Sequence, residues 1–172
     1  TKKNIVDYTG VVLRFSTAFG LSPRMRFDLS ISEFVKEMYD GKELEVYDEH
    51  TWRPYCHVRD FARLLDLVIN SEKEKVNFEV FNAGGDINNS TKKMLIDEIM
   101  AHLPNAKVTY SANGNDPRNY KVSFKKVKET LGFEPEYLVK DGVKELIEAL
   151  DLGLYNDFTE NKNKYGNYNI NY

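Results

Sequence analysis

The sequence lacks the features that mark several protein classes. A single cysteine, Cys56, excludes an internal disulfide, and its apolar neighbours predict a small buried side chain rather than a reactive thiol. There is no apolar stretch of membrane-spanning length and no signal-peptide pattern, so we expect no membrane partner and a cytoplasmic protein. The 24 basic and 27 acidic residues leave a formal charge of -3, which gives no overall attraction to nucleic acid. Any anion site must therefore be local.

What is present indicates one folded α/β domain. The content of 41% hydrophobic and 30% charged residues is sufficient for a core over 172 residues. Strands are expected over residues 11–16, 43–47, 55–58, 78–83 and 107–110. Helices are expected from Ser30 to Gly41, Asp60 to Val68 and Ser90 to about Leu103, then one that ends at Leu131 and one over 143–150. This alternation is typical of an α/β fold.

Local signals refine these expectations. The continuous apolar run Val11–Leu13 predicts a strand buried on both faces, and a break is expected at residues 52–54. Ser30, with Glu33 three residues later, forms a capping-box pattern, and Asp60 and Ser90 are also predicted to cap helices. From residue 156 the chain is rich in Asn, Tyr and Lys without a regular period, which predicts a loose tail over 156–172.

Four segments resemble motifs of one enzyme family. They are Leu13-Arg14-Phe15-Ser16-Thr17-Ala18-Phe19-Gly20, residues 52–60 (Trp-Arg-Pro-Tyr-Cys-His-Val-Arg-Asp), residues 81–85 (Phe-Asn-Ala-Gly-Gly) and residues 116–120 (Asp-Pro-Arg-Asn-Tyr) with 124–126 and 131–135. In this order they resemble the extended short-chain dehydrogenases, specifically the NAD-dependent nucleotide-sugar epimerases and dehydratases. The likeness runs from about Val11 to Leu150. Thr17 stands where the family usually has Asn, and Leu21 where it has Pro.

The resemblance implies a fold and a ligand. It implies that residues 1–155 are the C-terminal, substrate-binding part of a Rossmann-type enzyme, with mixed strands and helices. Segments 11–16 and 78–83 would then be strands of an incomplete Rossmann sheet. The implied substrate is a nucleoside-diphosphate sugar, and the implied cofactor of the complete protein is NAD. The sugar and the choice among epimerase, dehydratase and reductase do not follow from these motifs.

The resemblance also implies site residues. The arginines of two motifs, Arg53 and Arg118, are expected to clamp the diphosphate, because a guanidinium group donates a planar pair of hydrogen bonds to such an anion. The alternative is that each arginine pairs with a nearby carboxylate such as Asp60 or Asp116. Thr17 keeps a hydroxyl that can bond a sugar hydroxyl or the diphosphate.

Other positions carry two interpretations each. Arg24 and Arg26 either orient the substrate anion or hold their own loop. Phe15 and Ser16 either lie beside the nicotinamide or simply end a buried strand. Histidine is a common catalytic base, but the place of His57 between Cys56 and Val58 favours a structural histidine. Gly84 and Gly85 are expected to form a turn, because no phosphate-loop pattern surrounds them.

Two family motifs are missing from the sequence. No tyrosine has a lysine four residues later, so the Y-x-x-x-K pair that transfers protons in this family is absent, and we expect no catalytic residue. The glycine-rich turn that holds the dinucleotide pyrophosphate is absent as well, so we expect this chain alone to bind NAD weakly or not at all. Truncation explains both absences, and the exposed strand edges then favour a homodimer or docking to an N-terminal Rossmann half.

Two competing interpretations stay open at this stage. One is a noncatalytic module for nucleotide-sugar binding or subunit interaction. The other is an unrelated α/β protein, for which Arg53 and Arg118 would lie far apart.

Overall fold

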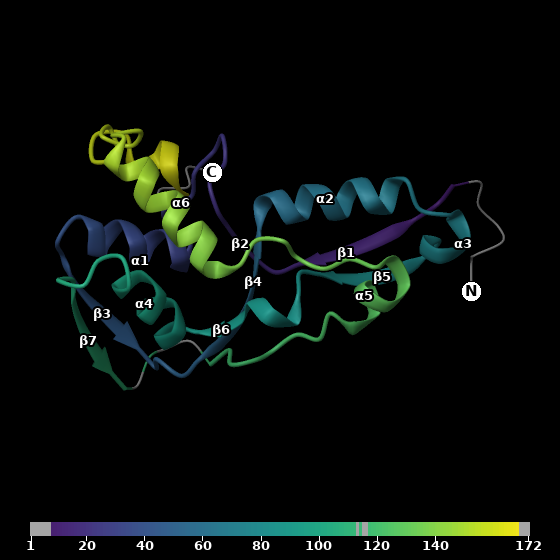
Figure 1. Ribbon diagram of the computed structural model, residues 1–172, viewed down its shortest axis with the longest axis horizontal. Helices are drawn as coiled ribbons and strands as arrows, with labels where there is room; N and C mark the ends of the chain where they lie inside the picture. The colour runs from purple at the N-terminus through teal and green to yellow at the C-terminus, as the bar shows by residue number, and fades with distance from the viewer. Residues whose placement is uncertain (1–7, 113, 115–116, 169–172) are drawn as a thin grey trace.

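The computed structural model describes residues 8–112, 114 and 117–168. Its elements form an elongated molecule (Figure 1). The strands are β1 Val11–Phe15, β2 Thr17–Phe19, β3 Glu43–Tyr47, β4 Trp52–His57, β5 Glu79–Ala83, β6 Asn89–Thr91 and β7 Lys107–Ser111. The helices are α1 Ser30–Tyr39, α2 Val58–Ile69, α3 Lys73–Val76, α4 Lys92–Met100, α5 Lys125–Leu131 and α6 Val139–Asp151, with short 3-10 turns at Asp86–Asn88 and Lys162–Tyr165.

The strands form three small sheets, and parallel pairing predominates. β1 pairs with β5, β2 with β4, and β3 with β7, all in parallel, while β6 is antiparallel to β4. The mixed α/β arrangement confirms the predicted fold class. The strand expected over 11–16 leads at Ser16 into a second strand with a different partner: the Ser16 backbone N–H and hydroxyl both donate to the carbonyl of Ala83, and the chain then pairs with β4.

Apolar side chains gather in two clusters at opposite ends of the molecule. The larger cluster lies among α1, α4, α6 and the β3–β7 pair, and includes Val35, Leu95, Ile99, Val143 and Leu146. The smaller cluster lies against the β1–β5 pair and draws on α2 and α5, with Leu64, Phe81, Phe124 and Val127 buried. The β2–β4–β6 sheet connects the two ends (Figure 1).

The prediction that β1 is buried on both faces is wrong for this chain. Val12 is 54% exposed and Phe15 is 50% exposed, although Val11 and Leu13 pack against the smaller cluster. Within the described residues β1 has a strand partner along one edge alone, and α2 runs alongside it (Figure 1). An apolar run shows that both faces of a strand can be buried. It does not show that this chain buries both faces by itself.

The capping predictions missed the capping residue at each helix. Leu29 precedes α1, while the Ser30 hydroxyl hydrogen-bonds the Tyr55 hydroxyl at 3.2 Å. Thr91, not Ser90, caps α4 by accepting from the Met94 N–H, and α4 ends at Met100 rather than about Leu103. Ser and Thr have similar cap preferences, so sequence alone does not separate adjacent candidates.

Two further local predictions changed in the structure. Residues 52–54, expected as a break, form the start of β4. Pro54 is paired with Asn89 of β6, and from the next residue on β4 is paired with β2. The helix over 58–69 is capped by the side chain of His57, not by Asp60. By contrast, α5 ends at Leu131 as predicted, and Gly132 follows it in the left-handed conformation.

The segment predicted as a loose tail is packed where the structure describes it. Tyr165 is buried in the larger cluster, and its ring and that of Phe158 contact Phe27. The Tyr165 carbonyl accepts a hydrogen bond from the Phe27 N–H at 2.7 Å. Aromatic rings spaced irregularly through a polar segment supply this apolar contact without any helical or strand period. Residues 169–172 of the expected tail lie outside the described residues.

None of the helices in the described part of the chain has the length and apolarity that a bilayer crossing requires.

Candidate functional site

The structure brings Arg53 and Arg118 together. Arg53 lies on β4, and its Nη1 donates to the backbone carbonyls of Trp52, at 2.8 Å, and of Arg118. Arg53 is half-buried, whereas Arg118 is exposed on the loop before α5. These contacts contradict the expectation of the unrelated-fold interpretation, in which the two arginines lie far apart.

Side-chain amides hold the Arg118 loop against the central sheet. The Trp52 N–H donates to the amide oxygen of Asn119 at 2.9 Å, and the Tyr120 N–H donates to the Trp52 carbonyl at 3.3 Å. Further along, the nearly buried Asn89 accepts from the Val122 N–H and donates to the Val122 carbonyl, at 3.1 and 3.0 Å. The loop position is therefore set by β4 and β6.

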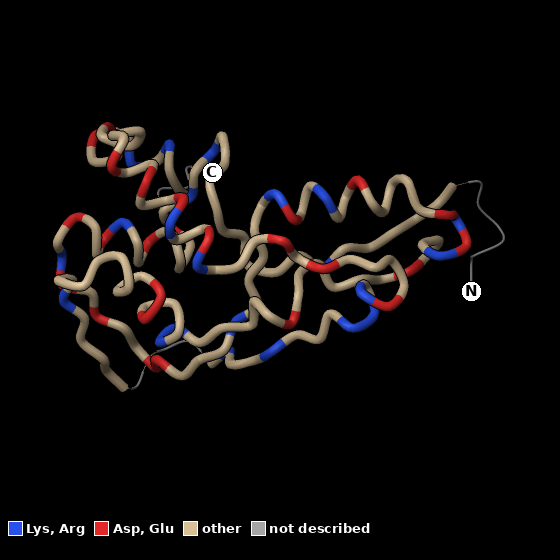
Figure 2. The backbone as a smooth tube through the Cα atoms, viewed as in Figure 1, with Lys and Arg blue, Asp and Glu red and all other residues tan. Residues whose placement is uncertain are grey.

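Aromatic rings support the cations of this region. The Arg53 guanidinium lies over the Tyr120 ring, 5.2 Å from its centroid, and the Lys121 ammonium lies 3.6 Å from the centroid of Trp52. Such contacts restrict the rotation of long cationic side chains. Basic and acidic positions are interspersed along the chain in Figure 2, so the positive charge contributed here is a local feature.

Asp60, one of the two carboxylates considered as an alternative arginine partner, belongs to a different network. Asp60 is completely buried and is bonded to Arg63, and to the backbone N–H groups of Glu136 and Tyr137 at 3.0 Å each. It accepts bonds from another part of the fold, and its placement explains why it does not cap α2. Asp116 lies outside the described residues.

Thr17 begins β2, next to the strand that carries Arg53. The parallel register sets Thr17 opposite Tyr55, two residues beyond Arg53 on β4. Thr17 is half-buried. The register thus places the Thr17 backbone near the end of β4 that carries the arginine.

Phe15 and Ser16 lie at the carboxyl end of β1. The Ser16 hydroxyl donates to the Ala83 carbonyl at 2.7 Å, and the half-exposed Phe15 ring packs edge-on against Phe61 at 4.8 Å between centroids. In open α/β sheets this end of a strand is where ligands bind. Phe15 exposes half of its surface at this end of β1, and its contact with a nicotinamide stays a prediction.

Arg24 and Arg26 have partners within their own loop and the C-terminal segment. Arg26 forms a two-pronged ion pair with Asp28, with both bonds at 2.6 Å, and Arg24 donates to the Asn167 side chain at 2.8 Å. The Arg26 hydrogen bond is the main cause that lowers the pKa of Asp28 to about 2. These contacts favour the loop-holding interpretation of the two arginines, and substrate contact by either stays a prediction.

His57 is part of a buried polar network rather than an accessible base. It is 1% exposed, its Nδ1 accepts from the Arg59 N–H at 3.2 Å, and its Nε2 lies 3.0 Å from Oε2 of Glu145. Because Nδ1 is an acceptor, the ring proton is on Nε2 and is donated to the carboxylate. Tyr137 stacks on the ring at 4.5 Å. The predicted structural role of His57 agrees with this geometry.

Cys56 is completely buried, and burial raises the pKa of its thiol to about 12. A thiol with such a pKa carries almost no thiolate near neutral pH, as the sequence predicted for a nonreactive cysteine. The described residues also contain no group of three or more His, Cys, Asp or Glu side chains placed to bind a metal ion.

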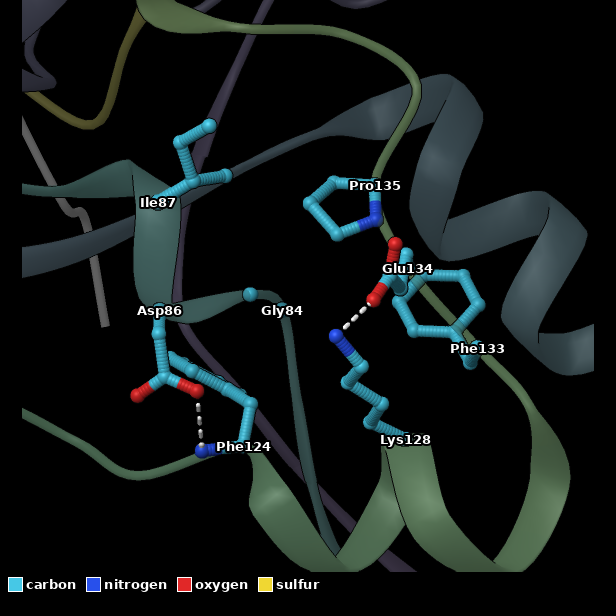
Figure 3. A pocket seen from close by; sticks show the side chains of 9 residues that line it. Gly84, Asp86, Ile87, Phe124, Lys128, Phe133, Glu134 and Pro135 are labelled. Atoms are coloured by element: carbon cyan, nitrogen blue, oxygen red, sulfur yellow. Dashed lines mark hydrogen bonds and ion pairs between the residues drawn. The ribbon is translucent and has the colours of Figure 1, made fainter.

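A separate pocket of about 370 Å³ lies beyond the end of β5 (Figure 3). Its single lysine, Lys128, points toward Glu134 and forms an ion pair with it, and Asp86 accepts from the Phe124 N–H at 3.3 Å. The remaining lining is mostly apolar, so this pocket offers little to an anion. Gly85 also lines it, and a side chain added there would overlap Pro135.

Sequence reasoning missed several residues that build these sites. Tyr120 belongs to the 116–120 segment, but its ring contacts Arg53 on β4, so no local pattern indicates its role. Asn89 and Glu145 gave no signal, because their partners are 33 and 88 residues away. Such contacts depend on the tertiary fold.

The family comparison agrees with the motifs. Residues 3–84 match the model described as the NAD dependent epimerase/dehydratase family. A UDP-glucuronate 4-epimerase of Thermodesulfobacterium geofontis is 29% identical over 140 residues, which are 79% of this chain and 41% of that protein.

Solved structures show the same fold. A dTDP-glucose 4,6-dehydratase from Bacillus anthracis, in complex with NAD, has a TM-score of 0.67 and 26% identity over 89% of this chain and 45% of its own. A UDP-glucose 4-epimerase from Thermotoga maritima, solved with UDP-glucose, has a TM-score of 0.70 and covers 84% of this chain and 46% of its own; at 24% identity it supports the fold alone. The chain thus spans less than half the length of the proteins it matches.

Proposed function

The chain is related to the NAD-dependent epimerases and dehydratases of the extended short-chain dehydrogenase family, and from this relationship we propose that it is the nucleotide-sugar-binding, C-terminal part of such an enzyme. The observation that carries the proposal is the meeting of Arg53 and Arg118, which come from two separate family-like motifs and are joined by a hydrogen bond. The relationship identifies the two arginines, and their proximity in this fold supports a phosphate-bearing ligand.

In this proposal Arg53 and Arg118 bind the diphosphate. A guanidinium group is planar, stays charged at every physiological pH and offers five N–H donors, which suits it to phosphate oxygens. Tyr120 and the carbonyls of Trp52 and Arg118 hold Arg53 in place before the ligand arrives, which reduces the entropy lost on binding. β2, with Thr17, and the loop that follows it face the sugar.

NAD belongs to the complete protein in this proposal. When bound it supplies hydride transfer, and Phe15 and Ser16 would lie beside its nicotinamide. The Ser16 hydroxyl already donates to Ala83, so its contribution is to fix the end of β1. Because the sequence contains neither the Y-x-x-x-K pair nor the glycine-rich turn, we propose that proton transfer and pyrophosphate binding depend on an N-terminal Rossmann half.

The same half would cover the open side of β1. Val12 and Phe15 on β1, with Leu65 and Ile69 on α2, are exposed apolar side chains beside a strand edge. Backbone N–H and C=O groups on such an edge pair readily with a further strand. An added parallel strand would satisfy them. Without it, we expect the chain to form homodimers or larger assemblies through this side, measurable by sedimentation velocity.

Titration calorimetry tests the proposed ligand. The chain, with and without a supplied N-terminal half, is titrated at low salt with UDP-, dTDP-, GDP- and CDP-sugars. We expect one nucleotide series to bind, and the supplied half to strengthen binding. Arg53→Ala and Arg118→Ala should each weaken it by about 1.5–3 kcal/mol, the usual cost of removing a charge-assisted partner. Lys144→Ala removes an exposed cation on α6 and serves as the control.

The alternative function is a noncatalytic nucleotide-sugar-binding or subunit-interaction module. The observation that favours it is the absence from the sequence of the two family motifs named above. The two proposals differ in one result. A chain that binds nucleotide sugar equally well with and without the N-terminal half, and gains no activity from it, would support the module. If neither preparation binds any of the nucleotide sugars, nucleotide-sugar binding is contradicted altogether.

A further inference from the structure

Glu145 on α6 contacts two parts of the molecule that are distant from it in sequence, the chain after β2 and the junction between β4 and α2. Its Oε2 lies 3.0 Å from Nε2 of His57 and accepts from the Leu21 N–H, also at 3.0 Å. Its Oε1 forms an ion pair with Nη2 of Arg59 at 2.8 Å. One carboxylate thus connects the end of β4, the first turn of α2 and the residue that follows β2 by two positions. Both oxygens of the Glu145 carboxylate therefore have partners, and one of these partners is a charged guanidinium group. Such a carboxylate is held strongly in one orientation.

Two glycines allow this close approach. Gly20 has a φ of +94°, and a side-chain carbon built on it would overlap the imidazole of His57. Gly142, one turn before Glu145 on α6, would overlap the ring of Phe19 if it carried a side chain. The chain leaving β2 therefore passes directly over the His57 ring, and α6 packs directly on the end of β2.

The far end of the same loop is also held by the C-terminal part of the chain. The Phe27 N–H donates to the Tyr165 carbonyl, and the Asn167 N–H donates to Asp28 at 2.9 Å. Met25 and Phe27 of this loop are buried. The loop from Leu21 to Asp28 is consequently fixed at both ends, with Glu145 at the end nearest Thr17.

We infer that Glu145, together with His57, is a positioning residue for the sugar side of the ligand site: it holds the backbone at Gly20–Leu21 and thereby the direction of β2 and of the loop that follows. This inference rests on the proposed function, in which β2 and this loop face the sugar. The contacts of Glu145 hold the chain that follows β2, so the inference concerns the part of the ligand that this chain would face.

The inference predicts a selective loss of affinity. In Glu145→Gln the side chain keeps its shape but loses its charge and one acceptor oxygen, so the bonds from Leu21, His57 and Arg59 are no longer all satisfied. We expect the affinity for UDP-glucose or dTDP-glucose to fall about ten-fold, the usual size of such a loss. The affinity for UDP or dTDP, which lack the sugar, should change less than about two-fold.

The experiment is calorimetry on the chain combined with its N-terminal half, using UDP-glucose with UDP and dTDP-glucose with dTDP. Glu148→Gln, an exposed glutamate one turn later on α6, is the matched control and should change neither affinity. His57→Gln, which keeps a side-chain donor toward Glu145, should lose less sugar-dependent affinity than His57→Ala. Thermal unfolding of each variant records any general loss of stability.

The outcomes separate the two proposals. If the unmodified protein binds no nucleotide sugar, the proposed function fails and this inference falls with it. If the unmodified protein binds but Glu145→Gln retains full affinity, the proposed function stands and the positioning role is wrong. Equal losses for the nucleotide sugar and the nucleoside diphosphate, in step with a lower melting temperature, would also overturn it, because they indicate a structural role alone.

Discussion

The two ends of the molecule differ in how their apolar side chains are covered. At one end α1, α4 and α6 enclose Val35, Leu95, Val143 and Leu146, all of which are almost completely buried. At the other end β1 and α2 leave side chains such as Val12 and Ile69 more than half exposed, at 54% and 78%. The first end is thus closely packed by elements of this chain, while the second exposes apolar side chains along β1 and α2 within the described residues.

The largest expected effect comes from emptying the closed end. Leu146→Ala should lower the free energy of unfolding by about 2–5 kcal/mol, because it leaves a cavity among buried side chains. Ile69→Ala, the matched change at the open end, should alter it by no more than about 0.5 kcal/mol. Chemical denaturation of the two variants measures the difference between these losses of unfolding free energy. Equal losses in the two variants would contradict the comparison. The Ile69→Ala measurement is then repeated in the presence of the proposed N-terminal half. If that half covers Ile69, the substitution should lower the free energy of unfolding more than it does in the chain alone.

A smaller effect is expected where the closed end meets the central sheet. Gly20→Ala and Gly41→Ala both introduce a side chain at a positive φ, +94° and +73°. Only the first meets an obstacle, the His57 ring, whereas nothing lies within 4 Å of the carbon added at Gly41. We expect Gly20→Ala to cost about 1–3 kcal/mol more than Gly41→Ala, the usual range for overpacking.

Thermal denaturation of the two glycine variants compares these costs directly. His57→Ala combined with Gly20→Ala should recover part of the loss by removing the obstacle. A double variant no more stable than the sum of the single changes would show that the clash is not the cause.

The smallest effect concerns pH and the packed C-terminal segment. The pKa of Asp28 is lowered to about 2, chiefly by its bond to Arg26. A lowered carboxyl pKa contributes stability above the unfolded-state value near 4, and this contribution is lost as the pH falls from about 4 to about 2. Because Arg26 is partly exposed, solvent screening reduces the contribution to about 1 kcal/mol.

Comparison of Asp28→Asn with the unmodified chain measures that contribution. Their difference in unfolding free energy should be largest near neutral pH and should diminish toward pH 2. A difference that stays constant across this range would contradict the assigned role of the Arg26–Asp28 pair.

The order of elements was predictable because it follows from local patterns. The parallel strands β1 and β5, the stripes of α2 and α6 and the end of α5 at Gly132 each have a signal within a short window. Helix starts were less predictable, since adjacent residues such as Ser90 and Thr91 have similar capping ability. The packed tail was missed because its contact with Phe27 joins residues more than a hundred positions apart.

The candidate site was predictable in part. Arg53 and Arg118 were selected because each sits in a segment resembling a known motif. The Arg53 side chain bonds to the Arg118 carbonyl, and the role of the two arginines in ligand binding stays a prediction. The partners of Arg24 and Arg26 could not be foreseen, because Asn167 is distant in sequence and Asp28 is one of several nearby acids. Glu145 has no sequence signal at all: its role depends on α6 lying across the end of β2, which is a property of the tertiary structure.

The junction at Ser16 links the open end to β2, which carries Thr17 of the proposed ligand site. A single residue separates β1 from β2, and both its N–H and its hydroxyl are bonded to Ala83. If the proposed partner aligns β1, it also fixes the origin of β2, and its docking and ligand binding would then be thermodynamically linked. Whatever factor the docked partner contributes to ligand affinity, the ligand must contribute equally to the affinity for the partner. A nucleotide sugar would then promote assembly of the two halves as strongly as assembly promotes its own binding.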